Sequence, residues 1–255
     1  MSFFRKIIVL FENNGVLAVC KPAGLPTQAP WGIESVESLI RRQKFQSLFE
    51  ESVATGGKRH PGGFLGVPHR LDRAVSGIML LASTPRAARQ LSRQFERREI
   101  RKTYIAIVKP RMGEAIKVEP FFWQDEIRKV PNEPRVEIVK SSDGNTKLAQ
   151  TRGRVLASHG GFHALELHPE TGRMHQLRVQ AARHGMPIVG DSLYDNVSAE
   201  DIDTIRNRPI ALHARSIEYV DPESNQSVIA RAPIPDISLW NSWHHTLSTQ
   251  EHEQS

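Results

Sequence analysis

The segment HRLDRAVSG, residues 69–77, places one carboxylate between two guanidinium groups. Asp72 lies between Arg70 and Arg73, and the apolar run IMLLA at 78–82 follows directly. A nearby cation lowers the pKa of a carboxyl group and keeps it ionised, which suits a nucleophile. The same residues could instead form a structural ion pair. The segment alone therefore leaves a reactive carboxylate and an ion pair as alternatives.

Few other residues are spaced for metal or disulfide chemistry. Cys20 is the only cysteine of the chain, which excludes an internal disulfide and a cysteine-based metal cluster. The histidine pairs 163/168 and 244/245 have no further ligands nearby in the sequence. We therefore predict no metal site, and a protein of a reducing compartment, the cytoplasm.

The composition describes a basic globular protein. The chain has 255 residues, 39% of them hydrophobic, and a net charge of +6. That is enough apolar material for a substantial core, and the basic balance favours an acidic partner such as nucleic acid. A basic protein with no such partner is the alternative. No apolar run approaches the ~18 residues of a membrane span, and the first residues lack a signal-peptide cleavage site.

The order of elements around the acidic segment is mixed. The turn KPAG at 21–24 follows an expected strand, and Gly160-Gly161 supplies the turn of an expected hairpin. Strands and helices alternate without strict βαβ order, which predicts an α+β fold with a mostly antiparallel sheet. We expect one domain over 1–240 and a flexible polar tail over 241–255. Strands are expected at 15–20, 78–82, 102–110 and 151–169, and helices at 33–50, 84–98 and 171–187.

The expected helix at 84–98 has two different faces. Thr84-Pro85 is a typical helix start, with a capping residue before a proline. One face is apolar, with Ala88, Leu91 and Phe95. The other is basic, with Arg86, Arg89, Arg93 and Arg97. A solvated helix face and a nucleic-acid-facing surface are both consistent with this row.

Five segments, taken in order, resemble the RluA-type pseudouridine synthases. These enzymes convert uridine in RNA to its C-glycoside isomer: the N1–C1′ bond breaks, the uracil rotates, and C5 joins C1′. The resemblance implies an RNA substrate, either ribosomal or transfer RNA, and a reaction without cofactor or metal. The segments are KPAGLP (21–26), HRLDRAVSGIMLLA (69–82), KTYIAIV (102–108), ELHPETGRMHQLRVQAARHGMPIVGD (166–191) and LHA (212–214).

The resemblance gives three residues catalytic roles. Asp72 matches the catalytic aspartate, which attacks the ribose or, on an alternative mechanism, abstracts a ribose proton. Tyr104 matches the active-site tyrosine, whose ring could stack on the uracil and whose hydroxyl could take part in the C5 proton step. Arg178 matches the arginine that pairs with the aspartate. A surface ion pair, a core tyrosine and a helix-surface arginine are the respective alternatives.

Four basic residues are candidates for substrate binding. Arg70 matches the arginine expected to fill the space left by the extruded base. Arg73 and Arg173 are candidates for phosphate contacts, with plain surface charge as the alternative. Lys21 could contact RNA or stabilise its own turn. His69 and His175 are interpreted as structural, hydrogen-bonded residues.

Three positions depart from the pattern of the family. Val75 stands where a threonine is usual, Met174 replaces a small hydroxyl residue, and Gln180 stands where a histidine is common. None of them removes the carboxylate, the tyrosine or the arginine. We expect activity to survive, with altered loop hydrogen bonding or substrate choice.

Two other functions compete with this interpretation. A non-catalytic RNA-binding or ribosome-assembly protein of the same fold is one, although retention of the catalytic set argues against it. A metal-assisted RNA phosphodiesterase using Asp72, His69 and His175 is the other, and it lacks the carboxylates a metal would need. We also expect a monomer with no N-terminal S4-like domain. The Gly-rich basic loop at 54–63 could close over RNA or be a surface insertion.

Overall fold

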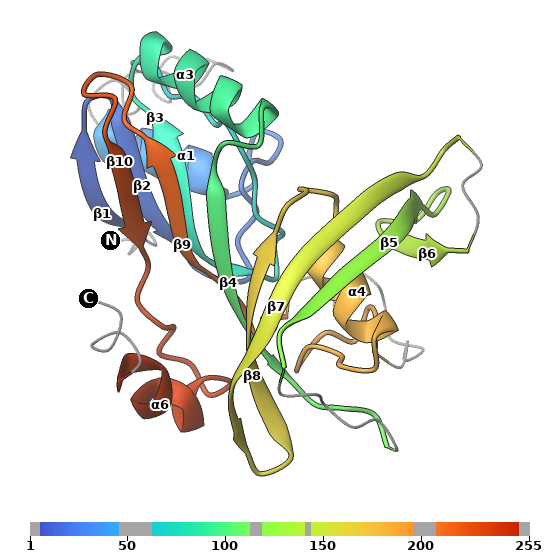
Figure 1. The fold of residues 1–255 in the computed structure, drawn as a ribbon. Coiled ribbons are helices and arrows are strands. Elements are labelled where there is room, and N and C mark those ends of the chain that lie inside the picture. Colours follow the sequence, from blue (N-terminus) through green and yellow to red (C-terminus); the bar gives the residue numbers. More distant parts are fainter. Residues whose placement is uncertain (1–5, 46–62, 113–118, 141–143, 196–207, 250–255) are drawn as a thin grey trace. The chain divides into compact units, whose positions relative to one another are not determined.

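The chain forms two compact units (Figure 1). The first consists of residues 1–100 and 216–233, and the second of residues 101–215 and 234–255. The single domain expected over 1–240 stays a prediction. The computed structural model describes residues 6–45, 63–112, 119–140, 144–195 and 208–249, so most of the Gly-rich loop lies outside the described residues.

The first unit contains two groups of antiparallel strands. β1 and β2 are joined by Asn14-Gly15, whose φ angles of 48° and 76° suit a tight two-residue hairpin turn. β3 pairs with the other side of β2 and is buried at every position, which explains its unbroken apolar sequence. The strands are β1 (Ile8–Asn13), β2 (Val16–Lys21), β3 (Ser76–Ala82), the end of β9 (Leu212–Val220) and β10 (Ser227–Arg231), which pairs with β9.

Two helices belong to this unit, α1 (Val36–Lys44) and α3 (Pro85–Glu96). α1 begins at a capping box formed by Ser35 and Ser38, three residues later than the predicted start. α3 begins as predicted, because the Thr84 hydroxyl accepts a hydrogen bond from the Ala87 amide at 3.1 Å. Its buried positions are Ala87, Leu91 and Gln94, so the inner face is rotated slightly from the predicted one.

The second unit is built on a five-stranded antiparallel sheet in the order β4-β8-β7-β5-β6. Gly160 and Gly161, with φ of 58° and 78°, form the predicted turn between β7 and β8. Helix α4 is shorter than predicted and begins only at Gln176. The elements are β4 (Arg101–Val108), β5 (Phe121–Lys129), β6 (Val136–Val139), β7 (Lys147–His159), β8 (Phe162–Pro169) and α4 (Gln176–Arg183).

The segment predicted as a loose tail is helical where it is described. A short 3-10 helix, η1 (Asn241–Trp243), continues into α6 (His244–Thr249). Two apolar residues in this polar stretch, Trp243 and Leu247, are each only 5% exposed. The Trp243 ring also meets His159 edge-on at 6.5 Å.

The predicted α+β class is confirmed. The strand pairs within each unit are antiparallel, and helices accompany both groups of strands. Among the described residues, no helix is both long enough and apolar enough to cross a membrane.

Candidate active site

Lys21 fixes the segment that contains Asp72. Its side chain is 0% exposed, and its ammonium group donates to the carbonyl oxygens of Pro22 at 3.0 Å, Arg73 at 3.1 Å and Val75 at 2.6 Å. The Gly24 amide also donates to the Arg73 carbonyl at 2.7 Å. Lys21 therefore stabilises the turn, which is one of the two alternatives given for it from the sequence, and a contact between Lys21 and RNA stays a prediction.

The backbone before Asp72 is held by a buried hydroxyl. Thr27 Oγ1 accepts from the amide of Leu71 at 3.1 Å and donates to the carbonyl of the same residue at 3.0 Å. His69 Nε2 accepts from the amide of Leu80 at 2.9 Å, and its ring stacks on Phe95 at 4.4 Å. His69 is thus a structural residue, as interpreted from the sequence.

Asp72 itself is half-buried in a turn closed by its own carbonyl, which accepts from the Val75 amide at 3.1 Å. Backbone groups are anchored on both sides of it, at Leu71 and at Arg73. A reacting carboxylate needs such fixed placement, because small displacements from productive geometry cost rate steeply. The neighbouring Arg70 and Arg73 are exposed, and Arg73 Nε donates to the Gly24 carbonyl at 3.2 Å.

In the second unit, Arg178 forms a buried bidentate ion pair with Asp191. Its Nε and Nη2 donate to the two carboxylate oxygens, each at 2.7 Å, and the two side chains are 5% and 2% exposed. The guanidinium also lies over the ring of Tyr194, 5.3 Å from its centroid. Asp191 ends the matched segment 166–191 but was not predicted from the sequence as the partner of Arg178. Pairing of Arg178 with Asp72 remains a prediction.

Tyr104 lies on the sheet face that α4 covers. Tyr104 is paired with Leu167 on β8, and Leu167 is paired in turn with Gly153 on β7. On its other side, Gly153 is paired with Phe121 on β5. Residues paired directly across antiparallel strands share one face of the sheet. A Cβ at Gly153 would lie 2.4 Å from the Phe121 ring, so only glycine admits this ring. Thr151, two residues before Gly153 and on the same face, contacts α4.

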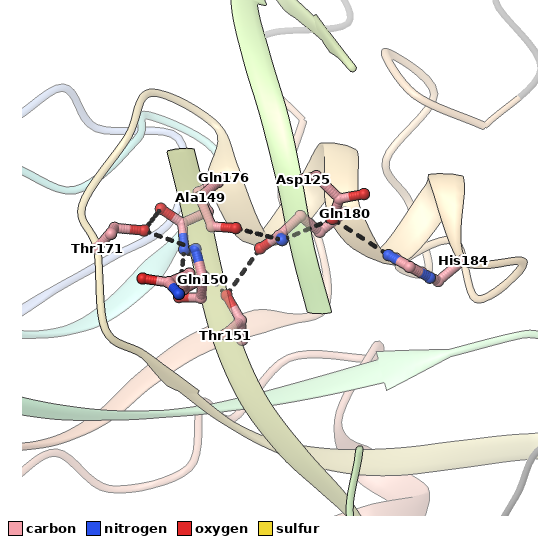
Figure 2. A network of polar contacts seen from close by, with 8 residues as sticks. All are labelled: Asp125, Ala149, Gln150, Thr151, Thr171, Gln176, Gln180 and His184. Atoms are coloured by element: carbon pink, nitrogen blue, oxygen red, sulfur yellow. Dashed lines mark hydrogen bonds and ion pairs between the residues drawn. The ribbon is translucent and has the colours of Figure 1, made fainter. Parts of the chain in front are cut away.

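The start of α4 is fastened to this sheet by Gln176 (Figure 2). Its amide nitrogen donates to Thr151 Oγ1 and to the Gln150 carbonyl, both at 2.9 Å. Its amide oxygen accepts from Thr171 Oγ1 at 2.7 Å and from the Arg173 amide at 3.1 Å. Because the helix has no side-chain cap, these bonds supply its anchoring. All four hydrogen-bonding positions of the Gln176 side chain are thus occupied.

Gln180, one turn further along α4, contacts both β7 and β5. Its oxygen accepts from Thr151 Oγ1 at 2.7 Å, and its nitrogen donates to Asp125 Oδ2 at 2.8 Å. His184 Nε2 reaches the same Asp125 oxygen at 3.1 Å, and the His184 ring stacks on Trp123. Burial opposes ionisation of Asp125, but hydrogen bonds from His184 and Gln180 outweigh it and hold the pKa of Asp125 below its usual value.

Gln180 is one of the three positions at which the sequence departs from the expected pattern. Gln180 and His184, one turn later, bind the same Asp125 carboxylate. Both side chains connect α4 to β5, so the helix that carries Arg178 is held at its start and along its length. The other departures, Val75 and Met174, are buried and exposed, respectively.

The remaining candidate, Arg173, is half-buried and donates from Nε to the Leu148 carbonyl at 3.1 Å. His175, interpreted as structural, pairs through Nδ1 with the Tyr194 hydroxyl at 2.8 Å. The structure therefore places Asp72 in the first unit, and Tyr104 and Arg178 on and above one sheet face of the second.

Comparison with known proteins places the chain in a family. Residues 15–183 match the family described as RNA pseudouridylate synthase. An uncharacterized RNA pseudouridine synthase of Zymomonas mobilis is 35% identical over 89% of this chain and 93% of its own length. The dual-specificity RNA pseudouridine synthase RluA of Yersinia pestis is 34% identical over 85% of this chain and 94% of its own.

A solved structure titled human RNA pseudouridylate synthase domain containing 4 has the same fold. It superimposes with a TM-score of 0.64 at 23% identity, over 95% of this chain and 92% of its own. Given the match to the family and the identity to its relatives, the chain belongs to the RNA pseudouridylate synthase family.

Proposed function

We propose that this protein isomerises specific uridines of ribosomal or transfer RNA to pseudouridine, with Asp72 as the reacting carboxylate. The observation that carries the proposal is the anchoring of the Asp72 segment by Lys21 and Thr27. A surface ion pair needs no such support, because exposed pairs tolerate motion and contribute little. Membership of the family supplies the reaction.

The reaction is balanced without a further reactant. The N1–C1′ bond breaks, C5 of the same uracil bonds to C1′, C5 loses its hydrogen as a proton, and N1 gains a proton. Asp72 attacks C1′ or, alternatively, removes a ribose proton to give a glycal. The Tyr104 ring stacks on the uracil, and its hydroxyl is positioned for the C5 proton step.

Arg178 supports the ionised carboxylate in this proposal. Arg70 enters the stack vacated by the flipped uridine, and Arg73 and Arg173 contact RNA phosphates. The proposed enzyme acts as a cytoplasmic monomer without metal or cofactor. Light scattering of the purified protein tests the monomer, and activity in the presence of EDTA tests metal independence.

The test is tritium release from RNA labelled at uracil C5, in a pool of unmodified ribosomal and transfer RNA. We expect release by the native protein and none above background by Asp72→Asn. Glu96→Gln removes one exposed carboxylate from the same unit and serves as the charge-matched control, with full release expected.

Two outcomes would contradict the proposal in different ways. Equal release by the native protein and Asp72→Asn would assign Asp72 to a structural ion pair. RNA binding by the native protein without any release would favour a non-catalytic RNA-binding protein of this fold. Mapping of the product then distinguishes ribosomal from transfer RNA.

A further inference from the structure

The outward face of α3 in the first unit carries a row of arginines. All five are exposed, and four follow one another at intervals of three or four residues. One acid, Glu96, occurs in residues 84–98, so this segment has five positive charges and one negative, a net +4. We call the set the arginine row: Arg86, Arg89, Arg93, Arg97 and Arg98.

These charges have few partners among the described residues. Arg97 lies 3.9 Å from Glu99, with both side chains about half exposed, and Arg86 donates to the Pro222 carbonyl at 3.4 Å. Within the described ranges, Arg89, Arg93 and Arg98 make no ion pair and no side-chain hydrogen bond. Three of the five guanidinium groups are therefore available to an external anion.

The energetics of the helix itself oppose this arrangement. Arg86–Arg89, Arg89–Arg93 and Arg93–Arg97 are like-charge pairs at i,i+3 or i,i+4, which destabilise a helix. The N-terminal end of a helix favours acids, yet the first turn of α3 contains none and Arg86 lies there. A helix selected only for its own stability would distribute these charges differently. An anionic polymer along this face would relieve all of these repulsions.

Arg98 adds an independent observation from the backbone. It follows the end of α3 with φ of 59°, in the left-handed region where glycine is the usual residue. Its amide donates to the Phe95 carbonyl at 3.2 Å, so the conformation is required to end the helix. Arginine at this position has a conformational cost that glycine lacks, and its side chain has no partner among the described residues.

The inner face of α3 links the row to the candidate site. Phe95 stacks on His69, three residues before Asp72 in the chain, and Leu91 is fully buried. The helix that presents the row thus packs against the segment that leads to the reacting carboxylate. RNA held along the outer face would be held by an element in direct contact with that segment.

We propose that the arginine row binds the phosphate groups of the RNA substrate, as a contact surface separate from the Asp72 segment. This inference rests on the proposed function for the identity of the polyanion. Guanidinium groups bind phosphate in bidentate fashion, and successive contacts along one backbone give affinity without reading sequence. The row would therefore set the salt dependence of binding and not the choice of uridine.

The first test measures RNA affinity against salt. A fluorescein-labelled, unmodified transfer-RNA transcript is titrated with the protein between 50 and 200 mM KCl, about the range in which phosphate contacts dominate. We expect the double variant Arg89→Gln/Arg93→Gln to reduce the magnitude of the log Kd against log salt slope by about 1.4 to 1.8, since each phosphate contact contributes about 0.7 to 0.9. Arg89→Lys/Arg93→Lys should retain most of the slope.

The matched control changes net charge equally elsewhere on the same unit. Lys6→Gln/Arg231→Gln removes two exposed charges outside the row, and we expect its slope to equal that of the native protein. Arg98→Gly tests the row without risk to the fold. The unfolding temperature should stay constant or rise, because glycine suits the left-handed position, while the slope decreases by about one contact.

The two proposals fail separately. If the row variants and the control have the native slope while tritium release persists, the arginine row does not bind RNA and the proposed function stands. If all charge-removing variants lower the slope equally, the slope depends on net charge, and the proposal that the arginine row binds RNA is overturned. If no RNA releases tritium, the proposed function fails whatever the slopes show.

Discussion

Removal of the Arg178 guanidinium should leave a buried carboxylate without its partner. In Arg178→Met, the Asp191 side chain, 2% exposed, loses both of its 2.7 Å hydrogen bonds. Breaking a buried ion pair from one side costs about 3–5 kcal/mol, mostly from the isolated charge. We expect the free energy of unfolding at pH 7.5 to fall by about that amount.

A second substitution identifies the cause. The double variant Arg178→Met/Asp191→Leu has no buried charge. Its free energy of unfolding should lie close to that of the native protein and should exceed that of the single variant, because apolar replacement of both partners is often neutral.

Urea unfolding at pH 7.5 and tritium release on the same samples complete the test. Both variants should release no tritium if Arg178 supports the reacting carboxylate, even though the double variant is stably folded. A double variant as unstable as the single one would refute the argument from the buried charge. Full activity of the double variant would remove Arg178 from the site.

Three further predictions test other parts of the two units. The lowered pKa of Asp125 contributes stability that is present above the unfolded pKa of this group and is lost as the pH falls through the folded pKa. The native protein should therefore be more stable than Asp125→Asn near neutral pH, and urea unfolding should show this difference shrinking below about pH 4. Gly153→Ala should lower the free energy of unfolding by about 1–3 kcal/mol, because the added methyl group would lie 2.4 Å from the Phe121 ring. Phe121→Ala in the same background should remove this clash. Thr27→Val should cost about 1–3 kcal/mol and reduce the rate of tritium release, because the buried amide and carbonyl of Leu71 lose their partner; an unchanged rate would mean that Leu71 is not required to position Asp72.

Local signals in the sequence predicted the local structure well. Thr84-Pro85 begins α3 because a hydroxyl cap and a proline at the first helical position act within one turn. Gly160 and Gly161 form a turn because both adopt positive φ. Such features depend on neighbours a few residues apart, and so they can be recognised without knowledge of the rest of the fold.

Long-range roles could not be predicted in the same way. Lys21 was a candidate for an RNA contact or for stabilising its own turn, and only the folded chain shows its contacts with carbonyls 52 and 54 residues away. Asp191 ends the matched segment 166–191, but only the folded chain shows its ion pair with Arg178. Trp243 stands in a polar stretch of the sequence. Its contact with His159, which lies on a hairpin more than eighty residues earlier, is visible only in the folded chain.

The anchoring of Asp72 gives a physical reason why two separated segments occur together in the sequence. KPAGLP at 21–26 supplies Lys21 and Gly24, and Thr27 follows directly; all three bind backbone groups of the 71–75 stretch. Burial of the Lys21 ammonium group and of the Thr27 hydroxyl costs desolvation free energy, even though both groups are hydrogen-bonded. Such a cost is expected where the position of the bonded segment matters. In the proposed function, that requirement is the placement of the Asp72 carboxylate, and the first segment holds the second in position.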